Sequence, residues 1–474
     1  MGKGTDASRM ESDEIIALAR EGRINVLDIR FLDLFGGSHH ITIPAVSVGS
    51  ELFTDGIPFD GGSVPGMKSR HSGDMVLLPD PTTAFMDPFW EKPTLSVIGT
   101  IAEADTRRPF YRDPRGLLAR AENLMRTEGI ADESIWGPEY EFFIFNSASF
   151  SVGKDHGFYQ VDCGEAWGDS PYRTGPHAAY HAAGPADAFC DLRQEITDIL
   201  LASGIHVKYH HHEVSACQQE IEIPLLPASL AADYSVWIKY VVKQVAARHG
   251  LAATFMPKPL QALFGNGMHF HQLLKKGGKN LFYERGGYAD LSKLAMNYIG
   301  GLLLHGRAIC ALTNPSTNSY RRLVPDQEAP VLFFFSLSNR SAAVRIPRYA
   351  TSSEEKRIEL RSPDATSNPY MAIAAQLLAG LDGIKKGIDP CELGLGPHDV
   401  PVGSIDPETL SRIPACPSSL EEALDALAQD HDFLLAGDVF TEDIIHTWID
   451  CKREEARELN AMPHPLEYER YFAC

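Results

Sequence analysis

The stretch 137-GPEYEFFIF-145 places two glutamates, Glu139 and Glu141, directly before an apolar run that is typical of a buried strand. Residues i and i+2 of a strand share one face, so both carboxylates point to the same side. A single Glu-x-Glu most often marks a solvated strand face, but unpaired carboxylates beside so apolar a run are costly. The stretch therefore favours a strand whose glutamates find partners elsewhere in the chain.

Three further segments repeat this spacing of two. They are 268-MHFHQLL-274 with His269 and His271, 356-KRIELRSP-363 with Arg357, Glu359 and Arg361, and 210-HHHEV-214 with His211 and Glu213. A lone His-x-His is more often structural than a metal ligand. Four such strands in one chain predict that one face of a sheet collects carboxylates, imidazoles and guanidiniums.

These residue types together indicate a particular chemistry. Carboxylates with one histidine suit Mg²⁺ or Mn²⁺. Several glutamates can converge only with cations present, because like charges raise one another's pKa. Arginines beside them indicate an anionic ligand such as a carboxylate or a phosphate. Metal ligands and arginines in one site are typical of phosphoryl transfer.

The composition limits the classes of protein and of partner that fit this sequence. The chain has 474 residues, 44 % of them hydrophobic, which is enough for a large core and at least two domains. Its net charge of −20 argues against nucleic acid or an anionic membrane as the main partner. An acidic total does not exclude an anionic substrate, because a pocket can be locally basic.

Cysteine usage and apolar runs indicate a soluble, cytoplasmic protein. The eight cysteines form no CxxC pair, which predicts reduced thiols and no disulfide framework or zinc ribbon. Residues 1–14 contain no apolar segment of a secretion signal. The longest apolar run, residues 294–312, is interrupted by Asn297, His305 and Arg307, so we expect one buried helix there and not a membrane span.

The order of segments predicts two domains in an α+β chain. A helix over 12–20 capped by Ser12, strands over 24–36 and 38–48 around a Gly-Gly turn, and a strand over 96–102 indicate a strand-rich N-terminal domain, residues 1–110. The catalytic domain, residues 111–474, alternates short strands with helices. We expect those helices over 116–129, 187–203, 228–249, 289–312, 368–386, 419–429 and 441–459. Ser419 and Glu422 form a capping-box pattern.

Taken in order, the motifs resemble class I glutamine synthetase over nearly the whole chain. The resemblance rests on 60-DGGSVPG-66, 137-GPEYEFFIF-145, 210-HHHEVSACQQE-220, 255-FMPKPLQALFGNGMHFH-271, 314-NPSTNSYRRLVPDQEAP-330, 339-NRSAAVRIP-347, 358-IELRSPDATSNPY-370 and the closing 462-MPHPLEYERYF-472. The longest of these are highly specific, whereas Glu-Tyr-Glu by itself is a weak signal.

The resemblance implies a fold, an assembly and a reaction. The fold is a small β-grasp-like N-terminal domain plus a larger domain with a curved antiparallel sheet flanked by helices. The assembly is a homo-oligomer, a dodecamer of two hexameric rings with active sites between neighbouring subunits. The reaction consumes glutamate, ATP and ammonium: ATP phosphorylates the γ-carboxylate, and ammonia then displaces phosphate from γ-glutamyl phosphate to give glutamine.

The resemblance also assigns residues. It implies two or more Mg²⁺ or Mn²⁺ ions per site, one held by Glu141, Glu213 and Glu220 and one by Glu139, His269 and Glu359. Glutamate and the transferred phosphoryl group would be held by Arg322, Arg340, Arg361 and Gly265. The nucleotide would be contacted by His271, Arg345 and Arg357. Glu328 matches a flap carboxylate that closes the site, and ammonium would be bound by Asp60 and Ser63 of a neighbouring subunit with Tyr180 and Glu213.

Four positions depart from the family pattern. Phe264 and Asn266 replace an asparagine and a serine in the loop that holds the amino-acid end of glutamate. Leu273 stands where a serine often faces the nucleotide, and Leu225 where an aromatic ring often stacks on adenine. We therefore expect ATP to be held chiefly through metals and arginines, with altered adenine contacts.

Two other functions remain open from the sequence. A γ-glutamyl ligase that uses a polyamine, alkylamine, aromatic amine or ethanolamine would keep the metal ligands and change the amine pocket. A non-catalytic assembly homologue would have lost metal ligands, and none of the matched ligands is lost here.

Overall fold

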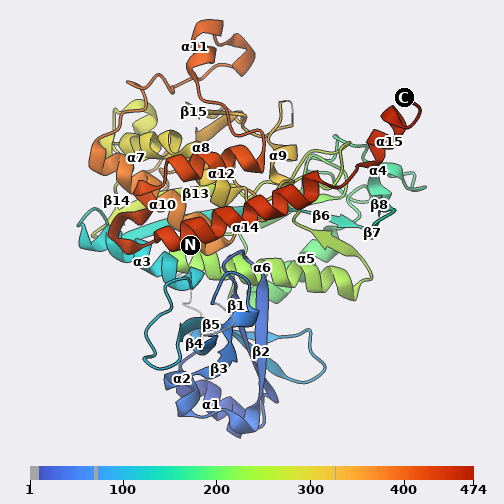
Figure 1. Cartoon of the computed structure of the whole chain (residues 1–474), viewed down its shortest axis with the longest axis vertical. Coiled ribbons are helices and arrows are strands. Elements are labelled where there is room, and N and C mark those ends of the chain that lie inside the picture. Colours follow the sequence, from blue (N-terminus) through green and yellow to red (C-terminus); the bar gives the residue numbers. More distant parts are fainter. Residues whose placement is uncertain (1–9, 69–72, 326) are drawn as a thin grey trace.

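The structure is a computed structural model that describes residues 10–68, 73–325 and 327–474. It has a smaller N-terminal part below a larger part in which helices flank a long sheet (Figure 1). The predicted α+β class is confirmed. The prediction that residues 1–14 contain no secretion signal falls mostly on residues 1–9, which lie outside the described range.

The N-terminal part is one five-stranded sheet with helix α1 (Ser12–Arg20) beside it. Ile15, Ile16, Leu27 and Ile29 are among the apolar residues that form its own core. The alternation of apolar residues along the central strands drives this burial, since period-two spacing puts them on one face. In sheet order the strands are β2 (Ser38–Pro44), β1 (Val26–Leu32), β5 (Thr94–Glu103), β4 (Asp74–Asp87) and β3 (Ile57–Asp60).

Polar contacts fix the small sheet against the larger part. Arg115 bridges Asp80 of β4, at 2.7 Å, and Asp233 of the larger part, at 2.9 Å. The Arg30 guanidinium lies 3.7 Å from the ring centroid of Tyr240. These contacts hold the two parts in one arrangement.

The larger part is built on one long, curved sheet. Its central strand β6 (Glu133–Phe145) contains the stretch quoted first, and residues 140–145 are buried. The pairings are antiparallel, as expected, except that the edge strand β15 pairs with β16 in parallel. In sheet order the strands are β15 (Leu332–Leu337), β16 (Ala342–Ile346), β17 (Ile358–Leu360), β13 (Phe270–Lys276), β6, β10 (Gln218–Glu222) and β9 (Tyr209–His212). The short strands β11 (Leu226–Pro227), β12 (Ala252–Thr254) and β14 (Lys279–Asn280) pair with β6 or β13.

Helices cover this sheet and pack on one another around helix α10 (Pro369–Lys386), which contacts α3, α6, α7 and α8. The long helices are α3 (Pro114–Thr127), α5 (Cys190–Ala202), α6 (Ala228–Arg248), α7 (Lys293–Leu304), α8 (Gly306–Thr313), α12 (Leu420–Gln429) and α14 (Glu442–Asn460). The shorter ones are α2 (Ser50–Thr54), α4 (Gly164–Trp167), α9 (Ser319–Arg322), α11 (Pro407–Arg412), α13 (Asp432–Leu435) and α15 (Pro465–Tyr471). The 3₁₀ turns are η1 (Ala45–Ser47), η2 (Gly61–Ser63), η3 (Tyr288–Asp290), η4 (Val402–Ser404) and η5 (Ala436–Asp438).

Two helix predictions need correction. The single helix expected over 289–312 is two helices, α7 and α8, which meet at His305. At this junction the buried His305 ring lies between Asp382 and Asp430, with 2.9 Å from a ring nitrogen to a carboxylate oxygen on each side. The N-cap of α1 is Glu11 and not Ser12, because Glu11 and Glu14 form a capping box one residue earlier. Ser419 does cap α12, as expected.

The expectation that all cysteines are reduced is wrong at one pair. Cys163 and Cys217 form a disulfide across 54 residues, and both side chains are fully buried. Spacing along the chain gave no sign of this bond, because the two segments meet only when the sheet forms. The other six cysteines are free thiols.

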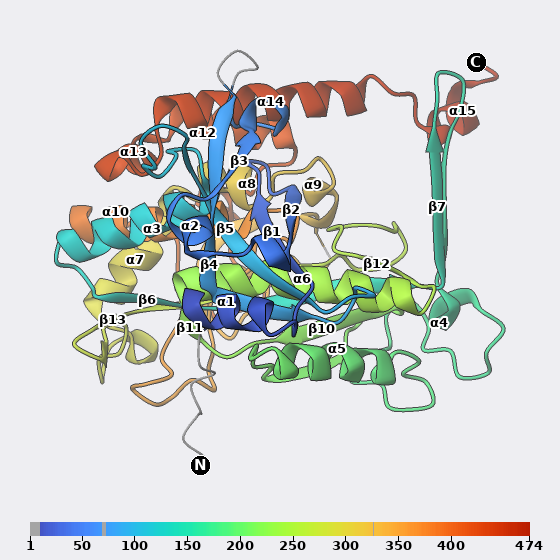
Figure 2. The ribbon, with the colours of Figure 1, turned by 90° about the horizontal axis from the view of Figure 1, so that it is seen from below.

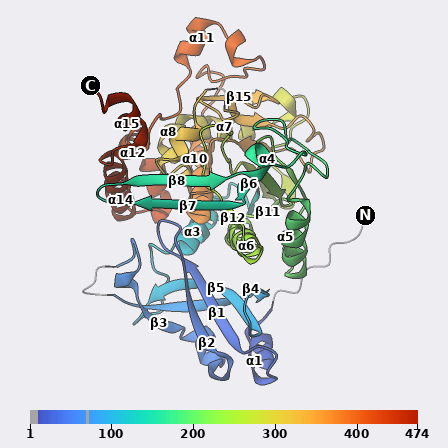
Figure 3. The same cartoon turned by 90° about the vertical axis from the view of Figure 1, so that its right-hand side faces the viewer.

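Two extensions leave the compact body. The hairpin of β7 (Ser147–Val152) and β8 (Gly157–Asp162) projects beside the C-terminal helix α15, which follows the long helix α14 (Figures 2 and 3). Both carry exposed aromatic side chains: Phe150, Phe158 and Tyr159 on the hairpin, and Tyr468, Tyr471 and Phe472 at the C-terminal end. Among the described helices, none is both long and apolar enough to span a membrane.

Candidate active site

Strand register assembles the polar groups that the sequence places two residues apart. Glu141 lies opposite Glu220, and Glu139 opposite Glu222, in the pair β6–β10. On the next strand, β9, His211 lies opposite Glu220. On the other side, Glu359 of β17 lies opposite both His271 of β13 and Arg345 of β16. The predicted face of a sheet with carboxylates, imidazoles and guanidiniums is therefore present.

This face lines a cavity of about 540 Å³, a size that suits a small ligand. Most of the predicted site residues line it: Glu139, Glu141, Tyr180, Glu213, Glu220, Gly265, His269, Arg322, Glu328, Arg340, Arg345, Arg357, Glu359 and Arg361. His271 is buried behind it and reaches Glu139, with 2.7 Å between His271 Nε2 and Glu139 Oε1. The cavity gathers residues that lie more than 200 positions apart in the sequence.

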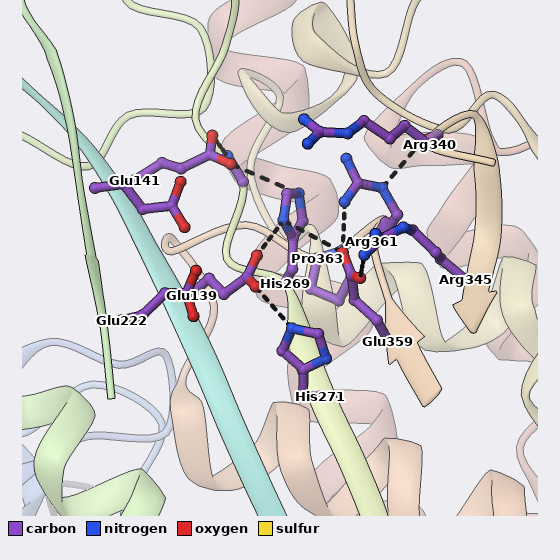
Figure 4. A network of polar contacts seen from close by, with 12 residues as sticks. Glu139, Glu141, Glu222, His269, His271, Arg340, Arg345, Glu359, Arg361 and Pro363 are labelled. Atoms are coloured by element: carbon purple, nitrogen blue, oxygen red, sulfur yellow. Dashed lines mark hydrogen bonds and ion pairs between the residues drawn. The ribbon is translucent and has the colours of Figure 1, made fainter. Parts of the chain in front are cut away.

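One group of cation ligands consists of Glu139, His269 and Glu359. Their ligand atoms lie within 4.8 Å of one another. His269 Nδ1 is 3.0 Å from Glu139 Oε2 and 3.9 Å from Glu359 Oε1, as Figure 4 shows. The structure thus brings together the three residues predicted for one ion.

A second group of candidate cation ligands lies on β9, on β10 and on the turn between these strands. Here the ligand atoms within 4.8 Å of one another belong to His211, Glu213 and Glu220. Glu141, predicted to share this ion, lies between the two groups: its Oε1 is 3.7 Å from His269 Nε2, and its Oε2 accepts a hydrogen bond of 2.7 Å from the Gly267 amide. His211, which the resemblance does not assign as a ligand, has a ring nitrogen within 4.8 Å of the carboxylates of Glu213 and Glu220.

The carboxylates differ in their proton affinity. Burial together with the neighbouring carboxylates of Glu139 and Glu213 raises the pKa of Glu220 well above its ordinary value. Burial also raises the pKa of Glu141 and of Glu213. Burial acts in the same direction on Glu139, but His271 and His269 outweigh it and hold the pKa of Glu139 well below the ordinary range.

These groups fit divalent cations. Carboxylate oxygens and one or two imidazole nitrogens from separate strands form a hard, oxygen-rich donor set, which suits Mg²⁺ and is tolerated with histidine by Mn²⁺. Burial, together with repulsion from nearby carboxylates, raises the pKa of Glu213 and of Glu220, and a bound cation would offset both effects.

Arginines lie beside the first group of ligands and line the same cavity. Arg345 and Arg361 both pair with Glu359, and although burial would raise the pKa of Glu359, the pairing with Arg361 brings it down to about 2. The buried Arg345 Nε is without a hydrogen-bond partner among the described atoms. Arg322 is buried and fixed by the Ser362 carbonyl, at 2.8 Å. Such fixed guanidiniums suit a carboxylate or phosphate.

The loop around Gly265 explains two departures from the expected pattern. A side chain at Gly265 would come within 2.3 Å of the Pro257 carbonyl oxygen, so only glycine fits. The buried Asn266 is held by the Gln218 side chain at 3.0 Å and the Met256 carbonyl at 2.9 Å, so it supports the loop from behind. Phe264 lines the cavity and packs against His177, with 4.2 Å between ring centroids and an angle of 31° between the rings.

The remaining predicted residues divide by domain. Tyr180 and Glu328 lie at the cavity, and Glu328 has φ +54°, a backbone conformation that is uncommon for a residue with a side chain. Asp60 and Ser63 lie in the N-terminal part, where the Ser63 hydroxyl donates to Asp60 at 2.7 Å, and neither is among the described residues that line this cavity. Their predicted contribution from a neighbouring subunit stays a prediction.

Several residues of the cavity were not predicted as site residues. Tyr209 and Glu222 could have been found, because they continue the period-two pattern of 209-YHHHEV-214 and 220-EIE-222. Others lie in loops without any such pattern: His181, Gln327, Tyr349 and Glu355. Leu225 and Leu273, suspected of altering the nucleotide end, pack with the apolar core, and neither is among the residues that line the cavity.

Comparison with known proteins agrees with this geometry. A family model described as "Glutamine synthetase, catalytic domain" matches residues 111–471, and one described as "Glutamine synthetase, beta-Grasp domain" matches residues 23–104. A glutamine synthetase of Aquifex aeolicus is 46 % identical over 466 residues, covering 97 % of this chain and 98 % of the relative. One of Frankia alni is 44 % identical, covering 98 % and 99 %.

Solved structures are similar over the same extent. The cryo-EM structure of Plasmodium falciparum glutamine synthetase has a TM-score of 0.89 at 27 % identity and covers 98 % of this chain and 100 % of that chain. A structure titled as a GmaS–ADP complex has a TM-score of 0.79 at 28 % identity and covers 97 % and 99 %.

Proposed function

The chain belongs to the glutamine synthetase family, and from this premise we infer that it is an ATP-dependent ligase that joins ammonia to the γ-carboxylate of L-glutamate. The products are glutamine, ADP and phosphate. The observation that carries this function is the convergence of two groups of cation ligands and a set of arginines in one cavity. Relatives named glutamine synthetase at 42–46 % identity over nearly the whole chain support ammonia as the acceptor.

We assign two divalent cations, Mg²⁺ or Mn²⁺, to the two groups. Glu139, His269 and Glu359 would hold one, and Glu213 and Glu220 the other, with Glu141 between them. When bound, the cations supply positive charge that neutralises the phosphates during phosphoryl transfer. The chain itself keeps the ligands in place through the register of β6, β10 and β13, so little reorganisation is needed when ATP binds.

The arginines would hold the two anionic substrates. Arg322, Arg340 and Arg361 are assigned to glutamate and the transferred phosphoryl group, and Gly265 brings the backbone close to the amino acid. His271, Arg345 and Arg357 are assigned to the nucleotide. Arg345 supports this assignment, because its buried Nε is unsatisfied by the described protein atoms and lies at the cavity. These groups orient the γ-carboxylate towards the γ-phosphate.

The amine end would be formed by residues from two subunits. Tyr180 and Glu213 line the cavity of one chain, and Asp60 and Ser63 are assigned to the neighbour. The carboxylate of Asp60 would attract ammonium and take its proton, so that neutral ammonia attacks γ-glutamyl phosphate. Glu328 would close the site and keep out water, which would otherwise hydrolyse that intermediate.

This arrangement requires an oligomer, for which we propose the dodecamer of two hexameric rings. The domain division at residues 110 and 111 and a cytoplasmic location likewise remain proposals from the sequence. The boundary is supported by the loop between β5 and α3, and by the end of one matched family segment at residue 104 and the start of the other at residue 111.

A panel of amines tests the function. Phosphate release from ATP is measured with glutamate, Mg²⁺ and either ammonium or one of several organic amines. We expect ammonium to support turnover and to yield glutamine, identified by mass spectrometry. Turnover with an organic amine and none with ammonium would overturn the proposal, and so would no turnover with any amine.

Two variants test the site. Arg340→Ala and Glu359→Ala are expected to lose at least about a hundredfold in turnover, since each removes a group that would touch the transferred phosphoryl or its cation. Arg348→Ala and Glu354→Ala are the matched controls, because both residues are exposed and neither is among the residues that line the cavity. Near-normal turnover of the first two variants, with the controls also active, would refute the assignment.

A further inference from the structure

The turn between Glu213 and Glu220 carries two of the assigned cation ligands, and a separate segment holds it from behind. That segment begins at Cys163, continues through α4 and reaches His181. Three backbone hydrogen bonds join it to the turn: Ala216 N–H to Pro176 at 3.2 Å, Ala179 N–H to Val214 at 3.1 Å and His181 N–H to His212 at 3.1 Å. Tyr180, assigned to the ammonium site, lies between two residues that make these bonds and is therefore held next to the metal-ligand turn.

Glu165 of α4 is the polar centre of this contact. Its Oε2 accepts hydrogen bonds from the Cys217 amide at 2.5 Å and from the His212 ring at 2.9 Å. Its Oε1 accepts one from the Ala188 amide at 3.1 Å. The other ring nitrogen of His212 reaches the Glu213 carbonyl at 2.8 Å. The buried Glu165 carboxylate therefore joins α4, the loop at Ala188 and the turn at Cys217. Through the His212 ring it is also linked to the backbone of Glu213, an assigned cation ligand.

The disulfide between Cys163 and Cys217 lies at the same place. Cys217 is three residues before Glu220, and Cys163 is two residues before Glu165. Cys217 has φ +63°, a region in which glycine is the default residue and a side chain costs energy. Cys217 therefore stands where glycine would be the less strained choice, and its side chain forms the bond to Cys163.

We propose that Cys163 and Cys217 form a thiol–disulfide site that positions the turn carrying Glu213 and Glu220, so that cation binding depends on the redox state of this pair. The proposal rests on the proposed function for the identity of the ligands. With the bond formed, the segment 163–181 is fastened covalently to the turn. With the thiols reduced, the segment keeps the hydrogen bonds of Glu165, the three backbone bonds and the ring contacts of Tyr180 and His181 with His211. It loses its covalent link to the turn, so the turn gains freedom.

The chemistry is thiol–disulfide exchange. Oxidation joins the two sulfurs as each thiol loses a proton and the pair loses two electrons, which a small-molecule disulfide such as oxidised glutathione takes up as it becomes two thiols. Reduction is the reverse reaction with a dithiol. Both sulfurs are fully buried, so exchange requires the segment 163–181 to open. In a reducing compartment such a bond is typical of redox sensing and not of permanent stabilisation.

Thermodynamic linkage couples cation binding and disulfide formation in both directions. If the disulfide strengthens cation binding, a bound cation must stabilise the disulfide by the same factor. Supporting groups that orient metal ligands typically change metal affinity by about 10- to 100-fold. We therefore expect Mn²⁺ to bind about tenfold more weakly to the reduced chain. Saturating Mn²⁺ should raise the glutathione ratio needed for reduction by a matching factor.

The experiment compares the oxidised and the reduced full-length protein. Thiol titration after denaturation should count six free thiols in the oxidised form and eight in the reduced form. Mn²⁺ affinity is then measured by calorimetry or electron paramagnetic resonance, without any turnover. In kinetics, the KM for ammonium should rise on reduction more than the KM for ATP, because Tyr180 is held by the same segment.

Variants separate the redox role from a role in folding. Cys217→Ser and Cys217→Gly should each bind Mn²⁺ like the reduced chain and lose all response to a dithiol. Cys217→Gly also removes the backbone cost at φ +63°, so it guards against a misfolded serine variant. Cys190→Ser is the matched control, because Cys190 is an exposed free thiol within the span that the disulfide encloses, and it should keep the full response.

Equal Mn²⁺ affinity of the two redox forms would overturn the proposal, and so would eight free thiols after equilibration with oxidised glutathione. The outcome is independent of the reaction itself. If neither form makes glutamine, the proposed function fails, yet a difference in Mn²⁺ affinity between the forms would still support the redox site.

Discussion

At the scale of single residues, the site is governed by how each carboxylate is charged. Glu359 is held ionised by Arg361, with a pKa of about 2, although burial acts against it. Glu220 faces the opposite situation, because burial and its carboxylate neighbours raise its pKa well above the ordinary value. The family resemblance implied both residues as cation ligands, one for each ion, yet their surroundings favour the ionised form of Glu359 and the protonated form of Glu220.

This difference predicts the pH dependence of cation binding. A cation binds the ionised form of Glu220, so protons compete with it, and the raised pKa extends this competition to higher pH than for an ordinary glutamate. Affinity for Mn²⁺ should rise with pH, and binding should release protons. Calorimetry at about pH 6 and about pH 7.5, in buffers of different ionisation enthalpy, measures both effects.

Glu220→Gln is the informative variant for that measurement. It should bind Mn²⁺ more weakly and show a shallower pH slope, since the competing proton site is gone. Glu354→Gln, an exposed residue, should leave the slope unchanged. An affinity of the unaltered protein that is independent of pH over this range would contradict the expected role of Glu220.

At the scale of elements, the periodicity of the sequence predicted most helices and strands. It did not predict where they end or which other elements they contact. The strand 137–145, the helices α3, α6 and α10 and the turn at Gly36–Gly37 follow directly from local patterns. The break between α7 and α8 does not, and the ring of His305 at the break is held by residues distant in the sequence, Asp382 of α10 and Asp430 at the end of α12. Register between strands is likewise a long-range property, although it alone puts Glu141 beside Glu220.

The packing of α14 gives a prediction about elements. Trp448 is fully buried, its indole N–H donates to the Ala311 carbonyl of α8 at 2.9 Å, and its ring stacks on Phe35 at 5.4 Å. Trp448→Ala should cost about 3–5 kcal/mol, because it leaves a cavity and an unsatisfied carbonyl. Thermal unfolding should show a clearly lowered Tm.

Trp167→Ala provides the comparison, since it makes the same substitution at a tryptophan that is exposed. Its Tm should stay close to that of the unaltered chain. A Trp448→Ala variant as stable as Trp167→Ala would mean that α14 is not fastened to α8 and the N-terminal part as described.

At the scale of the whole molecule, exposed apolar groups lie on the two extensions. Leu466, Tyr468, Tyr471 and Phe472 are exposed on and next to α15, at the end of an arm formed with α14 (Figure 1). Apolar side chains gathered on a projecting arm are typical of a contact between subunits. They support the proposed oligomer, in which Asp60 and Ser63 would reach a neighbour's cavity.

A truncation tests the role of this arm. A chain that ends after Asn460 lacks α15 and should form a smaller assembly than the full chain, as measured by light scattering after size-exclusion chromatography. A chain with Leu393→Ser is the control, because Leu393 is also exposed but belongs to neither extension. Assemblies of equal mass for the full and truncated chains would exclude α15 as a subunit contact.

The sequence by itself determined the fold class, the chemistry and most residues of the site. It could do so because the spacing of two residues within each strand is a local property of extended backbone, and because long motifs resemble one family. The tertiary structure decided which strands are neighbours, which carboxylates lie close together, and that His211 lies beside Glu213 and Glu220. It alone brought Cys163 to Cys217 behind the turn, since such contacts arise from packing between segments that are distant in the chain and carry no local periodicity.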